Sequence, residues 1–115
     1  MVRSRWAVVI GCGAVALAAC GSSGHTSAAL DRTCQNLSAV LSDGPDPSAD
    51  PVGFAEAQIL PLRQVHTDDV SLQHAVQQLD AAYQQTFESD GAATAERAVA
   101  TASARLDAIC PGAAP

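Results

Sequence analysis

Apolar residues recur at helical spacing in four stretches of this chain, and no stretch of any length alternates apolar and polar residues as a strand does. The first stretch covers about residues 28–42. One helix face in it carries Leu30, Cys34, Leu37 and Leu41. Thr26 or Ser27 could cap its start, and Asp43-Gly44 would stop it. The pattern predicts an all-α fold.

A second helix is expected to begin at Pro51, with Asp50 as its N-cap, because proline suits the first turn of a helix. Its apolar stripe consists of Val52, Ala55, Ile59 and Leu62, with Phe54 beside it. Pro61 lies inside this pattern, so we expect a kink or a break near residues 57–60.

Two further helices are expected over about residues 69–89 and 93–109, and Asp90-Gly91 separates them. The apolar side of the longer one is formed by Leu72, Ala75, Val76, Leu79, Ala82, Tyr83 and Phe87. The seam of the last one is formed by Ala95, Val99, Ala102, Leu106 and Ile109. Short loops favour antiparallel neighbours, so residues 28–110 are predicted to form a small up-and-down bundle of three to four helices. Residues 111–115 are expected to fray.

The start of the chain has the pattern of an export signal. Arg3 and Arg5 precede a run of apolar residues and glycine over residues 6–19. A permanent membrane helix needs roughly 20 apolar residues, so a retained transmembrane anchor is the weaker interpretation. We therefore expect residues 1–19, including Cys12, to be removed.

The end of that run, Leu17-Ala18-Ala19-Cys20, resembles the lipobox of bacterial lipoproteins. The resemblance implies transfer of a diacylglyceryl group to the Cys20 sulfur and cleavage just before it. Two acyl chains give durable attachment, whereas one chain holds a protein only marginally. Residues 20–27 would then be the lipidated cysteine and a flexible tether, at the extracytoplasmic face of the cell membrane. The alternative is ordinary secretory cleavage beside an incidental cysteine.

Two cysteines remain beyond the anchor, Cys34 and Cys110, and an even pair in an exported protein predicts a disulfide. The bridge would clamp the first helix to the end of the last one. In the chain-entropy model a loop of this length adds about 4–5 kcal/mol of stability. Two free thiols and a two-cysteine metal site are the alternatives, although no further ligand lies at suitable spacing.

The charge balance excludes one class of partner. Without residues 1–19, four of the six cationic residues face twelve acidic ones, so the mature net charge is −8. An acidic domain without a basic stripe does not suit nucleic acid, because that affinity comes largely from cations that contact phosphate.

Two clusters could suggest metal sites. Asp43, Asp46 and Asp50 lack the ligand spacing of a calcium loop, and helix stop, turn and N-cap roles explain them. His66 with Asp68 and Asp69 needs further ligands, and His74 lies in the next helix. We expect no metal and no cofactor.

No nucleophile turn or phosphate-binding loop occurs, so catalysis is not expected. Two surfaces remain as candidates for binding. One is a glutamine-rich side of the third helix, otherwise a solvated face, formed by Gln73, Gln77, Gln78, Gln84 and Gln85. The other is a groove at Pro61, flanked by Leu60, Leu62 and Arg63.

The lipobox, Thr33-Cys34-Gln35, the loop at residues 42–47 and the closing residues 108–111 together resemble small cell-envelope lipoproteins of actinobacteria, of the mycobacterial type. The resemblance implies a location and a helical fold, and no mechanism. We expect a non-catalytic binding or accessory module for an envelope protein. The alternative is a carrier of a small apolar ligand or lipid, held in the bundle interior or the Pro61 groove.

Overall fold

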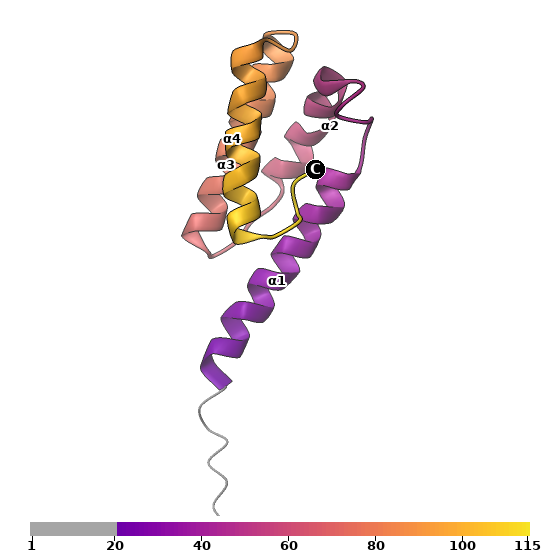
Figure 1. The fold of residues 1–115 in the computed structure, drawn as a ribbon. Coiled ribbons are helices and arrows are strands. Elements are labelled where there is room, and N and C mark those ends of the chain that lie inside the picture. The colour runs from indigo at the N-terminus through magenta and orange to yellow at the C-terminus, as the bar shows by residue number, and fades with distance from the viewer. Residues whose placement is uncertain (1–20) are drawn as a thin grey trace, which may run out of the picture.

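The protein was analysed as a computed structural model that describes the backbone of residues 21–115 and the side chains of residues 28–115. The predicted signal peptide and Cys20 lie outside the described residues. The described chain consists of α1 (Gly21–Ser42), α2 (Pro51–Arg63), α3 (Val70–Glu88) and α4 (Ala93–Ile109). The helices run alternately up and down as a four-helix bundle (Figure 1). The predicted all-α fold class is confirmed.

The centre of the bundle is α3, which packs against α2 on one side and α4 on the other, while α1 packs along α2. The largest fully buried side chains of the core are Leu37, Leu62, Leu72, Leu79, Leu106, Gln58 and Cys110. Leucines from every helix therefore meet in one cluster, which explains why four short amphipathic helices form one domain.

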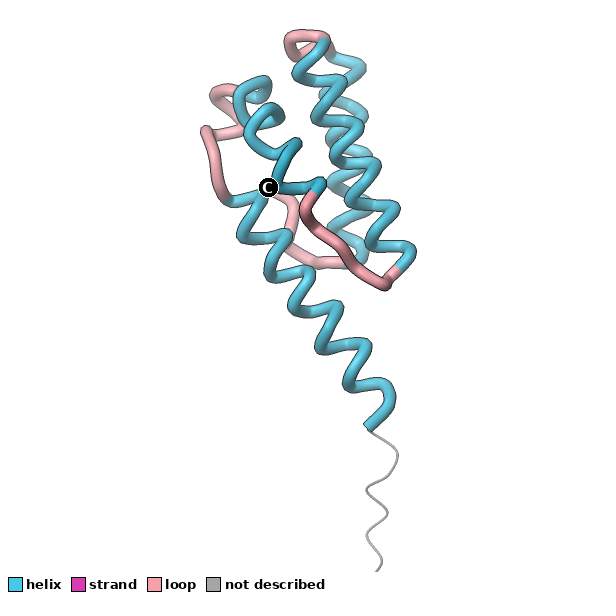
Figure 2. Tube along the Cα trace, turned by 180° about the vertical axis from the view of Figure 1, so that it is seen from behind, coloured by secondary structure: helices cyan, strands magenta, loops and turns pink. Residues whose placement is uncertain are grey.

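The first helix begins earlier than the sequence pattern predicted. The pattern placed its start near residue 28 and a flexible tether before it, whereas the backbone is helical from Gly21 onward. The first turns of α1 consequently project beyond the other helices (Figure 2).

Aspartate caps fix the starts of α2 and α3, and the cap at Asp50 was predicted. The Gly53 amide donates to Asp50 Oδ1 at 2.9 Å, and the Leu72 amide donates to Asp69 Oδ1 at 2.8 Å. Gly53 permits its cap geometrically, because a Cβ at this position would collide with the Asp50 carboxylate. Pro61 lies within α2, which continues to Arg63, so of the two outcomes expected near residues 57–60, a kink or a break, the break does not occur. Proline in the last turn interrupts only one intrahelical hydrogen bond.

The turn at Asp90-Gly91 ends α3, as predicted. Both residues have positive φ, 53° and 79°, and the Gly91 amide donates to the Thr86 carbonyl at 2.8 Å. Glycine suits such a C-terminal turn because it adopts positive φ without a steric cost. One core assignment is wrong: Phe87 is 45% exposed, and its neighbour Thr86 is buried instead.

The predicted disulfide between Cys34 and Cys110 is present, with Cα atoms 5.3 Å apart. It links α1 to the end of α4. The segment after it was expected to fray, but it folds back toward α1 (Figure 1). Ala113 is only 6% exposed, and its amide donates to the Cys110 carbonyl at 3.1 Å. Burial of a small apolar residue beside the disulfide holds this tail in place.

Candidate functional site

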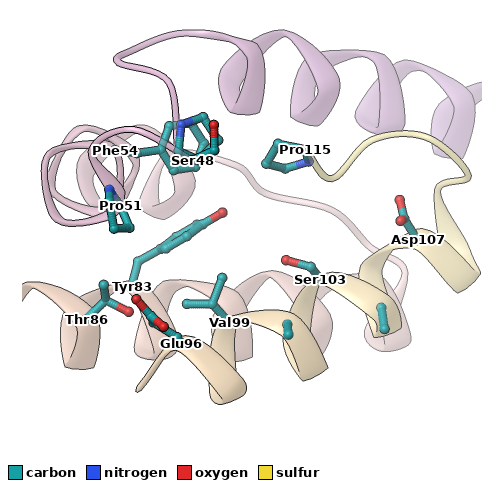
Figure 3. Close-up of a pocket in the computed structure, with 13 residues that line it drawn as sticks. Ser48, Pro51, Phe54, Tyr83, Thr86, Glu96, Val99, Ser103, Asp107 and Pro115 are labelled. Atoms are coloured by element: carbon teal, nitrogen blue, oxygen red, sulfur yellow. The ribbon is translucent and has the colours of Figure 1, made fainter. Parts of the chain in front are cut away.

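A cleft of about 570 Å³ separates the start of α2 and the preceding loop from α3 and α4 (Figure 3). Small-molecule sites in proteins occupy roughly 300–1,000 Å³, so the volume suits a small ligand. The cleft is lined by Pro47, Ser48, Pro51, Phe54, Tyr83, Thr86, Glu96, Val99, Ala100, Ser103, Ala104, Asp107 and Pro115. Most of the lining residues are apolar.

The longest wall of the cleft is one stripe of α4. It runs from Glu96 to Asp107 with residues three and four apart in sequence, the spacing that places side chains on one helix face. Ala100 and Ala104 supply only methyl groups to this stripe. Small side chains on α4 therefore leave the space that larger residues would fill.

Tyr83 extends from α3 toward the middle of the cleft, and its hydroxyl lies between Ser48 and Pro115 on one side and Ser103 on the other (Figure 3). The ring packs edge-to-face on Phe54, with centroids 5.7 Å apart. Only 2% of Tyr83 is exposed, and its hydroxyl oxygen is buried with no hydrogen-bond partner among the described residues. Burial disfavours the phenolate and raises the pKa of Tyr83 to about 12.

The charged side chains that line the cleft are both acidic, Glu96 and Asp107. Asp107 Oδ1 also accepts a hydrogen bond from the Ala114 amide at 3.2 Å, which fastens the tail beside the cleft. No arginine or histidine belongs to the lining residues. The cleft therefore offers an apolar interior, a phenolic donor and a negative rim.

The aspartates considered for calcium have structural roles. Asp46 Oδ1 accepts hydrogen bonds from the Ser48 hydroxyl and amide, at 2.6 and 2.8 Å. These two hydrogen bonds, the hydroxyl first, lower the pKa of Asp46. Asp50 caps α2, and the Asp43 carbonyl accepts from Gln58 Nε2 at 2.6 Å. The turn and cap interpretations are confirmed for Asp46 and Asp50.

The histidine cluster is not assembled into a ligand set. Asp69 caps α3, and the Asp69 amide donates to the Thr67 hydroxyl at 3.2 Å. Across residues 28–115, no three His, Cys, Asp or Glu side chains lie close enough together to hold a metal ion.

The two surfaces singled out from the sequence differ from their expected character. Three of the glutamines are partly buried and engaged within the domain: Gln73 accepts from the Thr67 amide, Gln78 from Arg105, and Gln84 donates to Asp80. At the Pro61 groove, Arg63 forms an ion pair with Asp80 at 3.3 Å. None of the residues named for that groove lines the cleft.

The unpartnered hydroxyl of Tyr83 was not predicted, because helical periodicity placed this residue only on the apolar side of its helix. The available signal was the pairing of the only tyrosine in the chain with a neighbouring helix rich in alanine. The burial of Gln58, which is 1% exposed within the core, was not predicted either.

No helix among the described residues is long and apolar enough to span a membrane. In the comparisons with known proteins, no family model, curated protein or solved structure matches this chain.

Proposed function

We propose that this protein is a membrane-anchored, extracytoplasmic carrier that binds a small apolar molecule in the cleft between α2, α3 and α4. The observation that carries the proposal is the cleft itself, about 570 Å³ in volume and lined mainly by apolar side chains. Concave apolar sites with a few convergent polar groups are typical of ligand-binding sites. The sequence raised two alternatives, an accessory module and a carrier. The cleft favours the carrier, with its site beside α4 rather than at Pro61.

The proposed location rests on residues outside the described part of the chain. The lipobox resemblance at residues 17–20 supports an acyl anchor on Cys20. The disulfide supports an oxidising compartment, because disulfides persist there and are rare in the cytosol. Cys20→Ala tests the anchor: in the host, the variant should lose incorporation of a labelled fatty acid and leave the membrane fraction. Unchanged fractionation and labelling would contradict the anchor.

We propose a binding role rather than an enzymatic one. The titratable side chains that line the cleft are Tyr83, Glu96 and Asp107, and no histidine or cysteine accompanies them. The hydroxyls of Ser48 and Thr86 donate to Asp46 and to the Ala82 carbonyl, and among the described residues no hydrogen bond joins a hydroxyl of the lining to Glu96 or Asp107. No nucleophile is therefore paired with a general base in the cleft.

Native mass spectrometry of the full chain, purified from its own host, tests the carrier function. The wild type should retain a bound small molecule. Ala104→Trp places an indole in the cleft and should abolish the bound mass, whereas Ala39→Trp on the exposed surface of α1 should retain it. Wild type without bound mass, or equal occupancy in both variants, would contradict the carrier.

A second candidate function is an accessory role toward an envelope protein. Leu60 and Val70, which flank the loop between α2 and α3, are 67% and 81% exposed. A contiguous exposed apolar patch marks a protein contact, so this role requires that Leu60 and Val70 contribute to one surface. Crosslinking in intact cells should recover a defined partner with the wild type and Ala39→Glu, and lose it with Leu60→Glu/Val70→Glu. Recovery of the monomer alone would contradict this role.

A further inference from the structure

The cleft contains a hydrogen-bond donor that nothing in the domain uses. The hydroxyl of Tyr83 is buried, and no described residue accepts its proton. An unpaired buried hydroxyl destabilises the folded protein, so it is a group for which a bound partner brings a gain. The hydroxyl points into the cleft and not into the core (Figure 3).

The charge of the cleft restricts what that partner can carry. Glu96 and Asp107 lie at the two ends of the α4 stripe, about 16 Å apart at 1.5 Å per residue. An anionic group in the cleft would meet carboxylates at both ends, and no lining residue could pair with it. Both carboxylates are exposed, so solvent screens their repulsion, but each still disfavours an anion within a Debye length of about 10 Å.

We propose that the ligand is a lipid-like molecule without negative charge, whose carbonyl or ether oxygen accepts a hydrogen bond from the Tyr83 hydroxyl while its hydrocarbon part lies along Val99 and Ala100. This inference rests on the proposed carrier function and specifies the chemistry of the ligand. The proposed chemistry excludes free fatty acids and acidic phospholipids as the natural ligand, because they have a suitable hydrocarbon part but carry a negative charge.

The tail residue Pro115 also lines the cleft. Pro115 lies beside the hydroxyl (Figure 3), and it is exposed, whereas Ala113 is buried. One hydrogen bond, from the Ala114 amide to Asp107, fastens this end of the tail. A ligand that displaces Pro115 therefore reaches the Tyr83 oxygen while Ala113 and the disulfide stay in place.

Photoaffinity labelling of the full chain in vesicles of zwitterionic lipid tests this inference. Three probes share one diazirine-bearing alkyl chain and end in a methyl ester, a carboxylate or a plain methyl group. Labelling by each probe is compared between protein variants in the same vesicles. The partition of the probe into the lipid is then equal in both measurements and cancels from the ratio. The readout is the probe concentration that half-saturates labelling of the cleft peptides.

Tyr83→Phe keeps the ring and removes the donor. We expect it to weaken ester labelling roughly three- to tenfold, the loss of one neutral hydrogen bond, and to leave the hydrocarbon probe unchanged. Glu96→Gln should strengthen carboxylate labelling, whereas Glu56→Gln, an exposed glutamate of α2 outside the cleft, should not.

The outcomes separate this inference from the carrier function. Equal ester labelling of wild type and Tyr83→Phe, or carboxylate labelling that ignores Glu96→Gln, would overturn the ligand chemistry while the cleft remained a binding site. Labelling of the cleft by none of the three probes would overturn the carrier function as well. Circular dichroism confirms that Tyr83→Phe is folded. The second readout is the ratio of the ester half-saturation concentration to that of the hydrocarbon probe, which should rise from the wild type to Tyr83→Phe, because lipid partition is the same for both proteins and cancels.

Discussion

At the scale of single residues, Tyr83 combines a packing role with an unused polar atom. Its ring closes the core against Phe54, whereas its hydroxyl is buried without a partner among the described residues. Phenylalanine would serve the packing role as well and would avoid the cost of an unpaired hydroxyl. The oxygen atom at this position therefore calls for an explanation outside the folded domain, and a ligand provides one.

Alkaline titration is a direct test of the environment of Tyr83, which is the only tyrosine in the chain. Burial raises its pKa from the ordinary value of 10.0 to about 12, so phenolate absorbance should appear near pH 12 in the native protein and near pH 10 in urea. The raised pKa means that its contribution to stability is complete below pH 10 and is lost as the pH rises toward 12. Tyr83→Phe should abolish this alkaline loss. A native midpoint near 10 would show that the hydroxyl is solvated.

Asp46 should titrate in the opposite direction. Its hydrogen bonds from Ser48 stabilise the carboxylate and lower its pKa below the ordinary value of 3.8. The stabilising effect is present above the ordinary pKa and is lost as the pH falls through the lowered one. Ser48→Ala removes the hydroxyl donor, so NMR titration of the carboxyl carbons should show the Asp46 pKa rising. An unchanged pKa would mean that the amide alone sets it.

Position on an apolar stripe predicted burial well for leucine and less well for residues near helix ends, and Leu60, which lies outside the stripe of its helix, is 67% exposed. Leu37, Leu72 and Leu106 are buried because their apolar faces leave no alternative. Thr86 is buried and Phe87 is exposed, the reverse of the prediction. A repeat of 3.6 residues places both near the edge of the same face, so the packing of the facing helix determines which of the two is buried.

At the scale of the helices, short-range chemistry decides where each one begins and ends. Asp50 and Asp69 satisfy backbone amides, and Asp90-Gly91 supplies positive φ, so these boundaries could be read from a few residues. At the start of α1 the sequence offered Thr26 or Ser27 as a cap, whereas the backbone is helical from Gly21, seven residues before the expected start. Where neither a cap nor packing acts, sequence alone does not locate a helix end.

Removal of the α3 cap provides the test at this scale. Asp69→Ala should lower the free energy of unfolding by about 1 kcal/mol, because the Leu72 amide loses its acceptor. Asp68→Ala is the matched control, an exposed aspartate one residue earlier that should change stability much less. Urea unfolding followed by circular dichroism measures both, and equal losses would assign the effect to charge near the helix start rather than to the cap.

At the scale of the whole molecule, the cleft arises from features that the sequence does not reveal separately. The proline-rich loop, the small residues of α4 and the returning tail each have ordinary local explanations. Only their arrangement around Tyr83 forms a site, and that arrangement depends on how far α2 stands from α4. Periodicity predicts which helix faces are apolar. It does not predict where two apolar faces are held apart and leave a cleft between them.

Loss of the disulfide should weaken the whole domain. Cys34→Ser/Cys110→Ser should lower the free energy of unfolding by about 2–4 kcal/mol, because the bridge restricts the unfolded chain and ties α1 to the end of α4. Urea unfolding measures the loss, and wild type in dithiothreitol should behave as the double variant does. Equal stability of the oxidised and reduced proteins would show that α1 is held by its packing on α2 alone.

The bridge between Cys34 and Cys110 also sets the mechanical behaviour of the domain. Tension applied along the chain from residue 21 to residue 115 crosses from one sulfur to the other, so it bypasses the intervening polypeptide, including α2, α3 and the cleft. A pulling force on α1 would uncoil only the turns before Cys34 and the short tail after Cys110. Residues 34–110 therefore form a covalently closed loop, which tension cannot extend as long as the disulfide is intact.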